Sequence, residues 1–120
     1  MVDFYERLGF GVRSFQAEGA TYYSVHFGDC RINFHLPEVW ESETLPPDYL
    51  RGDTAIPGCG DICFVWDGTL SELTKHLDGR GITIVKGPVE MSGGRAQGSA
   101  KGTSVYCRDP DTNLLEFIVY

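Results

Sequence analysis

The sequence is poor in basic residues. It contains 10 Lys and Arg residues against 17 Asp and Glu, which gives a formal net charge of −7 at pH 7. Proteins that bind nucleic acids or anionic membrane surfaces do so through clustered Lys and Arg side chains. We therefore expect neither a nucleic acid nor a membrane among the partners of this protein.

Long apolar runs are also absent. No stretch approaches the roughly 20 apolar residues of a transmembrane helix, and the chain does not open with a basic segment followed by an apolar one. A cytoplasmic location is therefore the default expectation. The 120 residues, of which 42% are hydrophobic, are enough for one domain with its own core.

The four cysteines include no Cys-x-x-Cys pair, so the spacing typical of a zinc site is missing. Cys30, Cys63 and Cys107 lie in or beside apolar, strand-like runs. A free cysteine in such a place usually behaves as a small hydrophobic residue. We interpret the cysteines as structural thiols rather than as disulfides or catalytic nucleophiles.

Hydrophobic periodicity predicts the same order of elements twice. The first set is a helix over 2–9 and strands over 12–18, 21–27 and 30–35. The second set is a strand over 60–65, a helix over 69–79, and strands over 81–85, 103–108 and 114–120. The second helix opens with the capping-box sequence Thr69-Leu70-Ser71-Glu72.

These two sets indicate an internal duplication in which the first copy lacks its opening strand. We predict an α+β fold of paired βαβββ modules. The whole chain, 1–120, would form one domain, with module one at 1–36, a linker at 37–57 and module two at 58–120. The prolines of the linker exclude a central strand and a helix interior, and Trp40 and Tyr49 are its expected packing anchors.

The Gly-rich segment 92–102 lacks the Gly-Lys-Ser/Thr ending of a phosphate-binding loop. We interpret it as an ordinary mobile hairpin loop, with a lid over a ligand as the alternative.

Glu116 is the residue that most indicates function, because it interrupts the apolar run 114–120. An unpaired carboxylate costs several kcal/mol to bury, so Glu116 must face water, a cation or a cavity. If two duplicated sheets face each other, the polar side of each strand lines a cleft. Asn33, Asp61 and Glu116 fall on that side, and His35 shares the phase of Asn33.

Oxygen donors and an imidazole gathered in a cleft are typical ligands of Mn²⁺, Fe²⁺, Ni²⁺ or Zn²⁺. Each residue also has an ordinary explanation. Asp61 would then be a strand-entry residue that bonds the backbone, Asn33 a solvated polar residue, and His35 a surface or core histidine. The pattern alone leaves both explanations open.

Three segments resemble the vicinal oxygen chelate superfamily: Phe-Tyr-Glu-Arg-Leu-Gly-Phe at 4–10, Pro-Gly-Cys-Gly-Asp-Ile-Cys-Phe at 57–64, and Ser-Val-Tyr-Cys-Arg-Asp-Pro-Asp-Thr-Asn-Leu-Leu-Glu-Phe at 104–117. The superfamily includes glyoxalase I, extradiol dioxygenases, methylmalonyl-CoA epimerase and the fosfomycin and bleomycin resistance proteins. The resemblance covers nearly the whole chain. Within the superfamily, the chain is most similar to small glyoxalase-domain-containing proteins of unassigned reaction.

The resemblance implies two βαβββ modules around a metal, with ligands from the first and last strand of each module. Glu116 falls on the last strand of module two, and Asp61 on its first strand, where His or Gln is commoner. Asn33 falls on the last strand of module one, with His35 as a nearby substitute. The first strand of module one, which would supply a further ligand, is missing from the chain.

The implied activity is that of a metal-dependent lyase, isomerase or dioxygenase. Such an enzyme chelates two adjacent oxygens of a small oxygenated substrate through Zn, Ni, Mn or Fe, and Glu116 would be the catalytic carboxylate that moves a proton.

One alternative is a metal-free binding protein of the bleomycin-resistance type. It would sequester an aromatic or cationic ligand with the help of the aromatic residues Trp40, Tyr49, Trp66 and Tyr106. The other is a truncated, inactive form. The missing strand would leave an open sheet edge, which favours a homodimer or a poorly stable chain.

Overall fold

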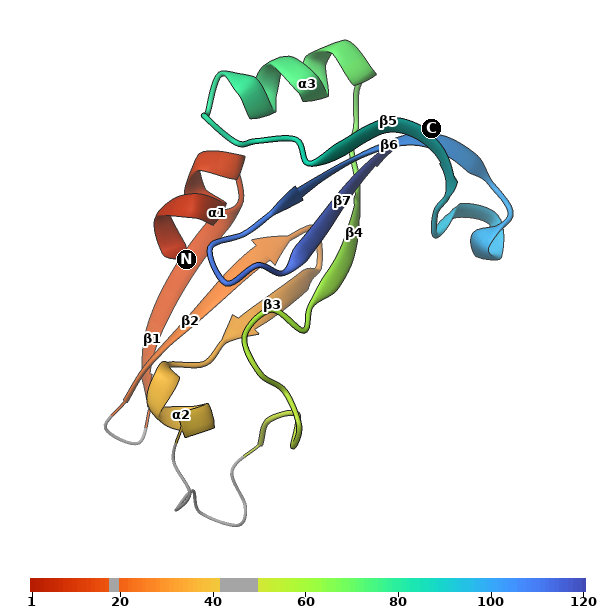
Figure 1. Cartoon of the computed structure of the whole chain (residues 1–120). Coiled ribbons are helices and arrows are strands. Elements are labelled where there is room, and N and C mark those ends of the chain that lie inside the picture. The colour runs from red at the N-terminus through yellow and green to blue at the C-terminus, as the bar shows by residue number, and fades with distance from the viewer. Residues whose placement is uncertain (18–19, 42–49) are drawn as a thin grey trace. The chain divides into compact units, whose positions relative to one another are not determined.

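The structure is a computed structural model that describes residues 1–17, 20–41 and 50–120. The chain forms two compact units, Met1–Ile56 and Pro57–Tyr120, here called unit 1 and unit 2. Each unit contains one sheet, coloured red to orange in unit 1 and green to blue in unit 2 (Figure 1). The fold is α+β, with two sheets and few helices.

Unit 1 contains helix α1 (Val2–Leu8), strands β1 (Gly11–Ala17), β2 (Ala20–Phe27) and β3 (Cys30–Phe34), and helix α2 (Pro37–Glu41). The strands form an antiparallel sheet in the order β1-β2-β3. Helix α1 ends at Gly9, whose φ of 96° is a left-handed conformation that glycine adopts without strain. The buried ring of Tyr5 lies 5.1 Å from that of Phe34, so α1 covers the face of the sheet that carries Phe34.

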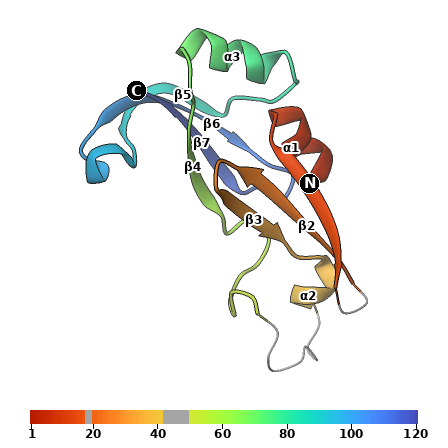
Figure 2. The same cartoon turned by 180° about the vertical axis from the view of Figure 1, so that it is seen from behind.

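Unit 2 contains β4 (Asp61–Val65), α3 (Leu70–Asp78), β5 (Lys86–Ser92), the 3₁₀ helix η1 (Arg95–Gly98), β6 (Lys101–Arg108) and β7 (Leu114–Val119). Its sheet has the order β4-β7-β6-β5, and Figure 2 shows it from behind. Strands β4 and β7 pair in parallel, whereas β7-β6 and β6-β5 are antiparallel. The first and last strands of the unit are therefore neighbours.

Unit 2 is thus a complete βαβββ module. Unit 1 has the same order of helix and three strands, and its described residues, 1–17, 20–41 and 50–56, contain no strand that corresponds to β4. The prediction of an α+β fold of paired modules, with the first strand of module one missing, is confirmed.

The predicted capping box at the start of α3 is present. The Thr69 side chain accepts a hydrogen bond from the Glu72 backbone N–H at 3.2 Å, and Glu72 Oε2 accepts one from the Thr69 N–H at 2.8 Å. Leu73 and Leu77 of α3 are completely buried. The sheet of unit 2 supplies further buried residues, which include Phe64, Val105, Cys107, Leu115 and Phe117.

The prediction of a strand at 81–85 was wrong. Residues 81–85 form no strand, because the ladder with β6 begins only at Lys86, which pairs with Tyr106. The Val85 N–H still donates a 2.8 Å hydrogen bond to the Tyr106 carbonyl, but this single bond does not extend the strand to residues 81–85. In the segment read as a linker, Pro37 opens the short helix α2, since the first helical position needs no backbone donor.

The connection between β5 and β6 is held at its tip. The Arg95 backbone N–H donates a 3.1 Å bond to the Tyr120 hydroxyl, and the Arg95 guanidinium lies 4.5 Å from the centre of the same ring. Of the expected packing anchors, Tyr49 falls outside the described residues, as does the side chain of Trp40.

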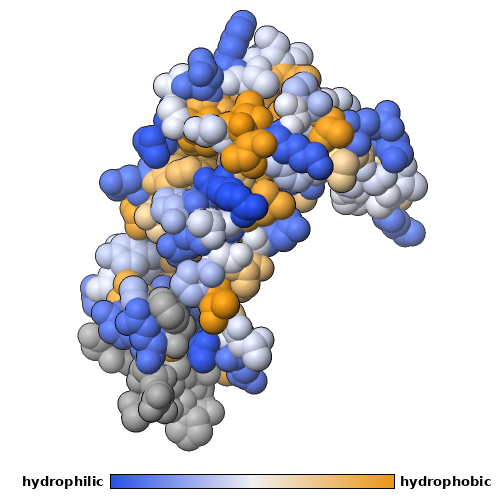
Figure 3. All heavy atoms as spheres, viewed as in Figure 1, coloured by the Kyte–Doolittle hydropathy of each residue, from blue (hydrophilic) through white to orange (hydrophobic). Residues whose placement is uncertain are grey.

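Large apolar side chains that remain exposed include Phe15, Leu50, Ile56, Val65 and Val85. On the face in Figure 3, orange apolar residues are interspersed with blue hydrophilic ones. No helix in the described parts of the chain combines the length and apolar character needed to cross a membrane.

Candidate functional site

Glu116 stands in the middle of a row of three side chains on the unit 2 sheet. Cys63 of β4 is its partner on one side, and Tyr106 of β6 is its partner on the other. Residues paired in this way point to the same face and lie on strands about 4.8 Å apart. The carboxylate is half-buried, with a thiol and a phenol beside it.

A fourth group comes from the residue two positions before Tyr106. The Ser104 side chain is completely buried, and its hydroxyl donates a 2.5 Å hydrogen bond to Glu116 Oε1. The pKa of the Tyr106 phenol is raised, first because the ring is buried and then because of the negative charge of Glu116, which also accepts its hydrogen bond. Glu116 is therefore surrounded by neutral hydrogen-bond donors.

The pKa of the Cys63 thiol is raised from 9.0 to about 11. Partial desolvation is the largest cause, followed by the charge of Glu116, a hydrogen bond to Glu116 and the charge of Asp61. The thiol is consequently protonated at neutral pH and is a poor nucleophile. All four cysteines are free, as predicted, but Cys30 and Cys63 are exposed rather than buried.

Asp61 is the first residue of β4 and pairs with Leu114. It lies two residues before Cys63, hence on the same face, and it is exposed. The structure thus brings Asp61 and Glu116 to one face of unit 2, where both charges act on Cys63.

The two candidate residues of unit 1 are both exposed. Asn33 lies in β3 opposite Ser24 of β2, which in turn lies opposite Arg13 of β1. Arg31 precedes Asn33 by two residues on the same face. His35 follows the end of β3. Two guanidinium groups therefore share the face that carries Asn33.

The described residues do not fit a divalent metal centre by themselves. They contain no group of three His, Cys, Asp or Glu side chains that could hold a metal ion. Unit 2 offers the two carboxylates of Asp61 and Glu116 beside a protonated thiol. In unit 1, the positive charges of Arg13 and Arg31 oppose a cation at Asn33.

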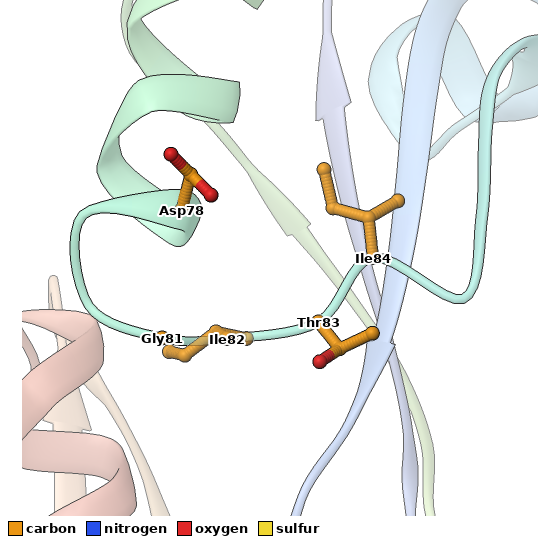
Figure 4. A pocket seen from close by; sticks show the side chains of 5 residues that line it. All are labelled: Asp78, Gly81, Ile82, Thr83 and Ile84. Atoms are coloured by element: carbon orange, nitrogen blue, oxygen red, sulfur yellow. The ribbon is translucent and has the colours of Figure 1, made fainter.

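One hollow of unit 2, with a volume of about 370 Å³, lies where α3 ends. It is lined by Asp78, Gly81, Ile82, Thr83 and Ile84, which Figure 4 shows on the end of α3 and on the segment that leads to β5. None of the predicted site residues lines this hollow.

The sequence interpretation overlooked Ser104 and undervalued Cys63 and Tyr106 as neighbours of Glu116. A signal was available in part, since strand alternation places Ser104 and Tyr106 on one face of β6. The order and register of the strands place that face beside Glu116, and the alternation of side chains along one strand does not reveal either.

The order of helices and strands within each unit agrees with comparisons to known proteins. Residues 1–117 match the family described as the Glyoxalase/Bleomycin resistance protein/Dioxygenase superfamily. The chain belongs to this superfamily. The resemblance noted in the sequence is thereby confirmed, and the glyoxalase-like fold is that of its relatives.

Two curated relatives in the glyoxalase superfamily match almost all of this chain. Glyoxalase domain-containing protein RDO1 of Mycosarcoma maydis is 38% identical over 120 residues, which cover 99% of this chain and 60% of RDO1. Virulence protein STM3117 of Salmonella typhimurium is 32% identical over 120 residues, 99% of this chain and 74% of that protein. The chain thus spans less than two thirds of the length of RDO1.

Solved structures confirm the glyoxalase-like fold. The integron cassette protein VCH_CASS1 from V. cholerae has a TM-score of 0.78 and 37% identity, over 99% of this chain and 83% of that one. The crystal structure of STM3117 also has a TM-score of 0.78, over 99% of this chain and 84% of that one.

Proposed function

We propose that this glyoxalase-like protein binds a small molecule that brings a positive charge or an acidic proton to Glu116. The observation that supports the proposal is a half-buried carboxylate whose partners, Ser104, Tyr106 and Cys63, are all neutral donors. Among the described residues, Glu116 forms no ion pair. A half-buried carboxylate without an ion-pair partner is stabilised when a ligand neutralises its charge.

Two modes of action follow from this chemistry. In the first, the protein sequesters a cationic or aromatic ligand, as the bleomycin-resistance part of the superfamily description suggests. In the second, the ligand is a small oxygenated substrate, and Glu116 takes a proton from it as a general base in a lyase or isomerase reaction. The neighbouring hydroxyls of Ser104 and Tyr106 would then orient the carboxylate.

A metal-dependent lyase, isomerase or dioxygenase is the second candidate. It is favoured by the superfamily match and by the carboxylates of Asp61 and Glu116 on the adjacent strands β4 and β7. These two residues would be the unit 2 ligands of a Zn, Ni, Mn or Fe ion, with Asn33 or His35 as proposed further donors. A bound divalent ion would supply a Lewis acid for two adjacent substrate oxygens.

The test uses the full chain and bleomycin as a cationic, aromatic probe, with binding measured by calorimetry before and after EDTA treatment. Glu116→Gln keeps a hydrogen-bond acceptor for Ser104 and removes the charge, so we expect binding to weaken at least about tenfold. Glu90→Gln, an exposed change on β5, is the matched control and should bind normally.

Each result separates the candidates. Binding that survives EDTA and depends on Glu116 supports the metal-free protein. One bound metal ion per chain, lost in both Asp61→Asn and Glu116→Gln, supports the metal-dependent enzyme. If bleomycin binding is the same in Glu116→Gln and the native protein, the proposed role of Glu116 is wrong. A homodimer remains part of the proposal, and sedimentation equilibrium tests it.

A further inference from the structure

We propose that the face of the unit 1 sheet opposite α1 binds a small aromatic anion, meaning a molecule with a ring and a carboxylate or phosphate group. This face, here called the arginine face, carries Arg13, Phe15, Tyr22, Ser24, His26, Arg31 and Asn33. The inference concerns unit 1 alone and does not depend on the role of Glu116.

Strand register defines the arginine face. Arg13, Ser24 and Asn33 form one row across β1, β2 and β3. The adjacent row contains His26 opposite Arg31. Side chains at alternate positions share a face, and the 2.9 Å contact between Ser24 Oγ and His26 Nε2 agrees with this assignment.

The charge of the arginine face is opposite to that of the chain as a whole. Arg13 and Arg31 are exposed, and neither forms an ion pair with another described residue. The described residues in these rows include no Asp or Glu. A guanidinium group binds carboxylate or phosphate through two parallel hydrogen bonds, so two of them on one small face favour an anion.

Polar groups between the arginines complete an anion site. The Ser24 side chain is only 2% exposed, and it occupies the centre of the row between Arg13 and Asn33. In the next row, Gly11 stands opposite His26 and has no side chain to fill the space. Ser24 holds His26 in place through their 2.9 Å contact, so the donors open to an anion are the exposed side chains of Arg13, Arg31 and Asn33.

An aromatic platform adjoins the anion site. Phe15 of β1 and Tyr22 of β2 are paired, with ring centres 5.3 Å apart and planes only 14° from parallel. Phe15 remains 45% exposed although it is a large apolar residue. It lies two residues from Arg13, about 7 Å along the strand. A ligand ring stacked on this pair would place an attached anionic group near Arg13.

The net charge of the whole chain argues against a large polyanion as the ligand of this face. Its net charge of −7 opposes nucleic acid, which leaves a small molecule as the occupant that the local charge favours. Phenyl phosphate is a suitable probe because it combines a ring with a dianion. Inorganic phosphate and phenol provide its two halves separately.

The experiment is a titration of the full chain with phenyl phosphate, followed by amide chemical shifts in NMR spectra. We expect shifts concentrated in β1, β2 and β3. Arg13→Gln and Arg31→Gln should each weaken binding about tenfold. Phe15→Ala should lower the affinity for phenyl phosphate but not for inorganic phosphate. Lys75→Gln, which removes one exposed positive charge from α3, should leave binding unchanged.

Several results would overturn the proposal. One is equal binding by the native protein and the double variant Arg13→Gln, Arg31→Gln, provided that circular dichroism shows both to be folded. Equal affinity for phenyl phosphate and inorganic phosphate would show that the Phe15–Tyr22 pair does not contribute to binding. A dimer that buries the arginine face, seen as concentration-dependent shifts of the same amides without any probe, would make this face an interface between copies instead.

Discussion

Cys63 of β4 and Glu116 of β7 occupy paired positions on two parallel strands, and the carboxylate raises the pKa of the thiol. A negative charge beside a thiol disfavours the thiolate. The thiol is therefore a reporter of the charge on Glu116, and this relationship can be measured directly.

The first prediction concerns the reactivity of Cys63. With a pKa of about 11, the thiol should react slowly with iodoacetamide at pH 8, because little thiolate is present. Glu116→Gln removes a negative charge, so the pKa of Cys63 should fall and alkylation should become faster. Peptide mass spectrometry gives the rate at each cysteine. Cys59 is exposed and serves as the internal control, and an unchanged ratio of the two rates would contradict the prediction.

The second prediction concerns Ser104. Replacing Ser104 with Ala removes the hydroxyl that donates to Glu116 Oε1 and leaves a half-buried carboxylate with one donor fewer. We expect the free energy of unfolding to fall by about 1–3 kcal/mol, as for other lost hydrogen bonds to charged groups. Urea unfolding measures it. Ser92→Ala, at the exposed end of β5, should change it little, and equal stabilities of the two variants would show that the Ser104 bond contributes nothing.

The third prediction is a loss of stability at high pH. Burial, and then the charge of Asp109, raise the pKa of Cys107 from 9.0 to about 11. The folded state therefore favours the protonated thiol, and this stabilisation is complete below pH 9 and disappears as the pH rises to 11. The expected loss is on the order of 1–3 kcal/mol.

Urea unfolding at a series of pH values tests this dependence. Tyr106, whose pKa is also raised, adds to the loss at the upper end of the range. The slope must therefore be compared with that of Cys107→Ala, which lacks the buried thiol and should depend less on pH. Identical slopes for the two proteins would refute the contribution of Cys107.

The fourth prediction uses a matched pair of glycines around the β5–β6 connection. A Cβ atom at Gly102 would lie 2.6 Å from the Val119 carbonyl and 2.7 Å from Ile118 Cγ1, so Gly102→Ala should destabilise the protein by about 1–3 kcal/mol. At Gly94 a Cβ atom would meet nothing within 4 Å, and Gly94→Ala should be neutral within about 0.5 kcal/mol. Thermal unfolding of both variants decides the matter.

Local signals in the sequence predicted most of the elements. The capping box at Thr69 and Glu72, and the glycine that ends α1, act within a few residues and need no tertiary information. The error at 81–85 has the opposite cause. Ile82, Ile84 and Val85 suit a strand, but a strand also needs a partner, and β6 pairs regularly only from Lys86 onward.

The candidate site was predictable only in part, for a similar reason. Glu116 was identified because a charged residue within an apolar run can be recognised from the sequence alone. Cys63 comes from a strand that is distant in sequence, and Ser104 and Tyr106 come from the preceding strand. The order β4-β7-β6 and its register make all three neighbours of Glu116. The roles of Asp61, Asn33 and His35 stay predictions, to be decided by metal and ligand binding.

The parallel pairing of β4 with β7 has a consequence for how unit 2 becomes competent to bind. Its outermost segments in the sequence are direct neighbours in the sheet, so the surroundings of Glu116 are assembled only when the last strand has docked beside the first. A polypeptide emerging from the ribosome would carry β4, β5 and β6 and still have no ligand-binding site until β7 has been synthesised.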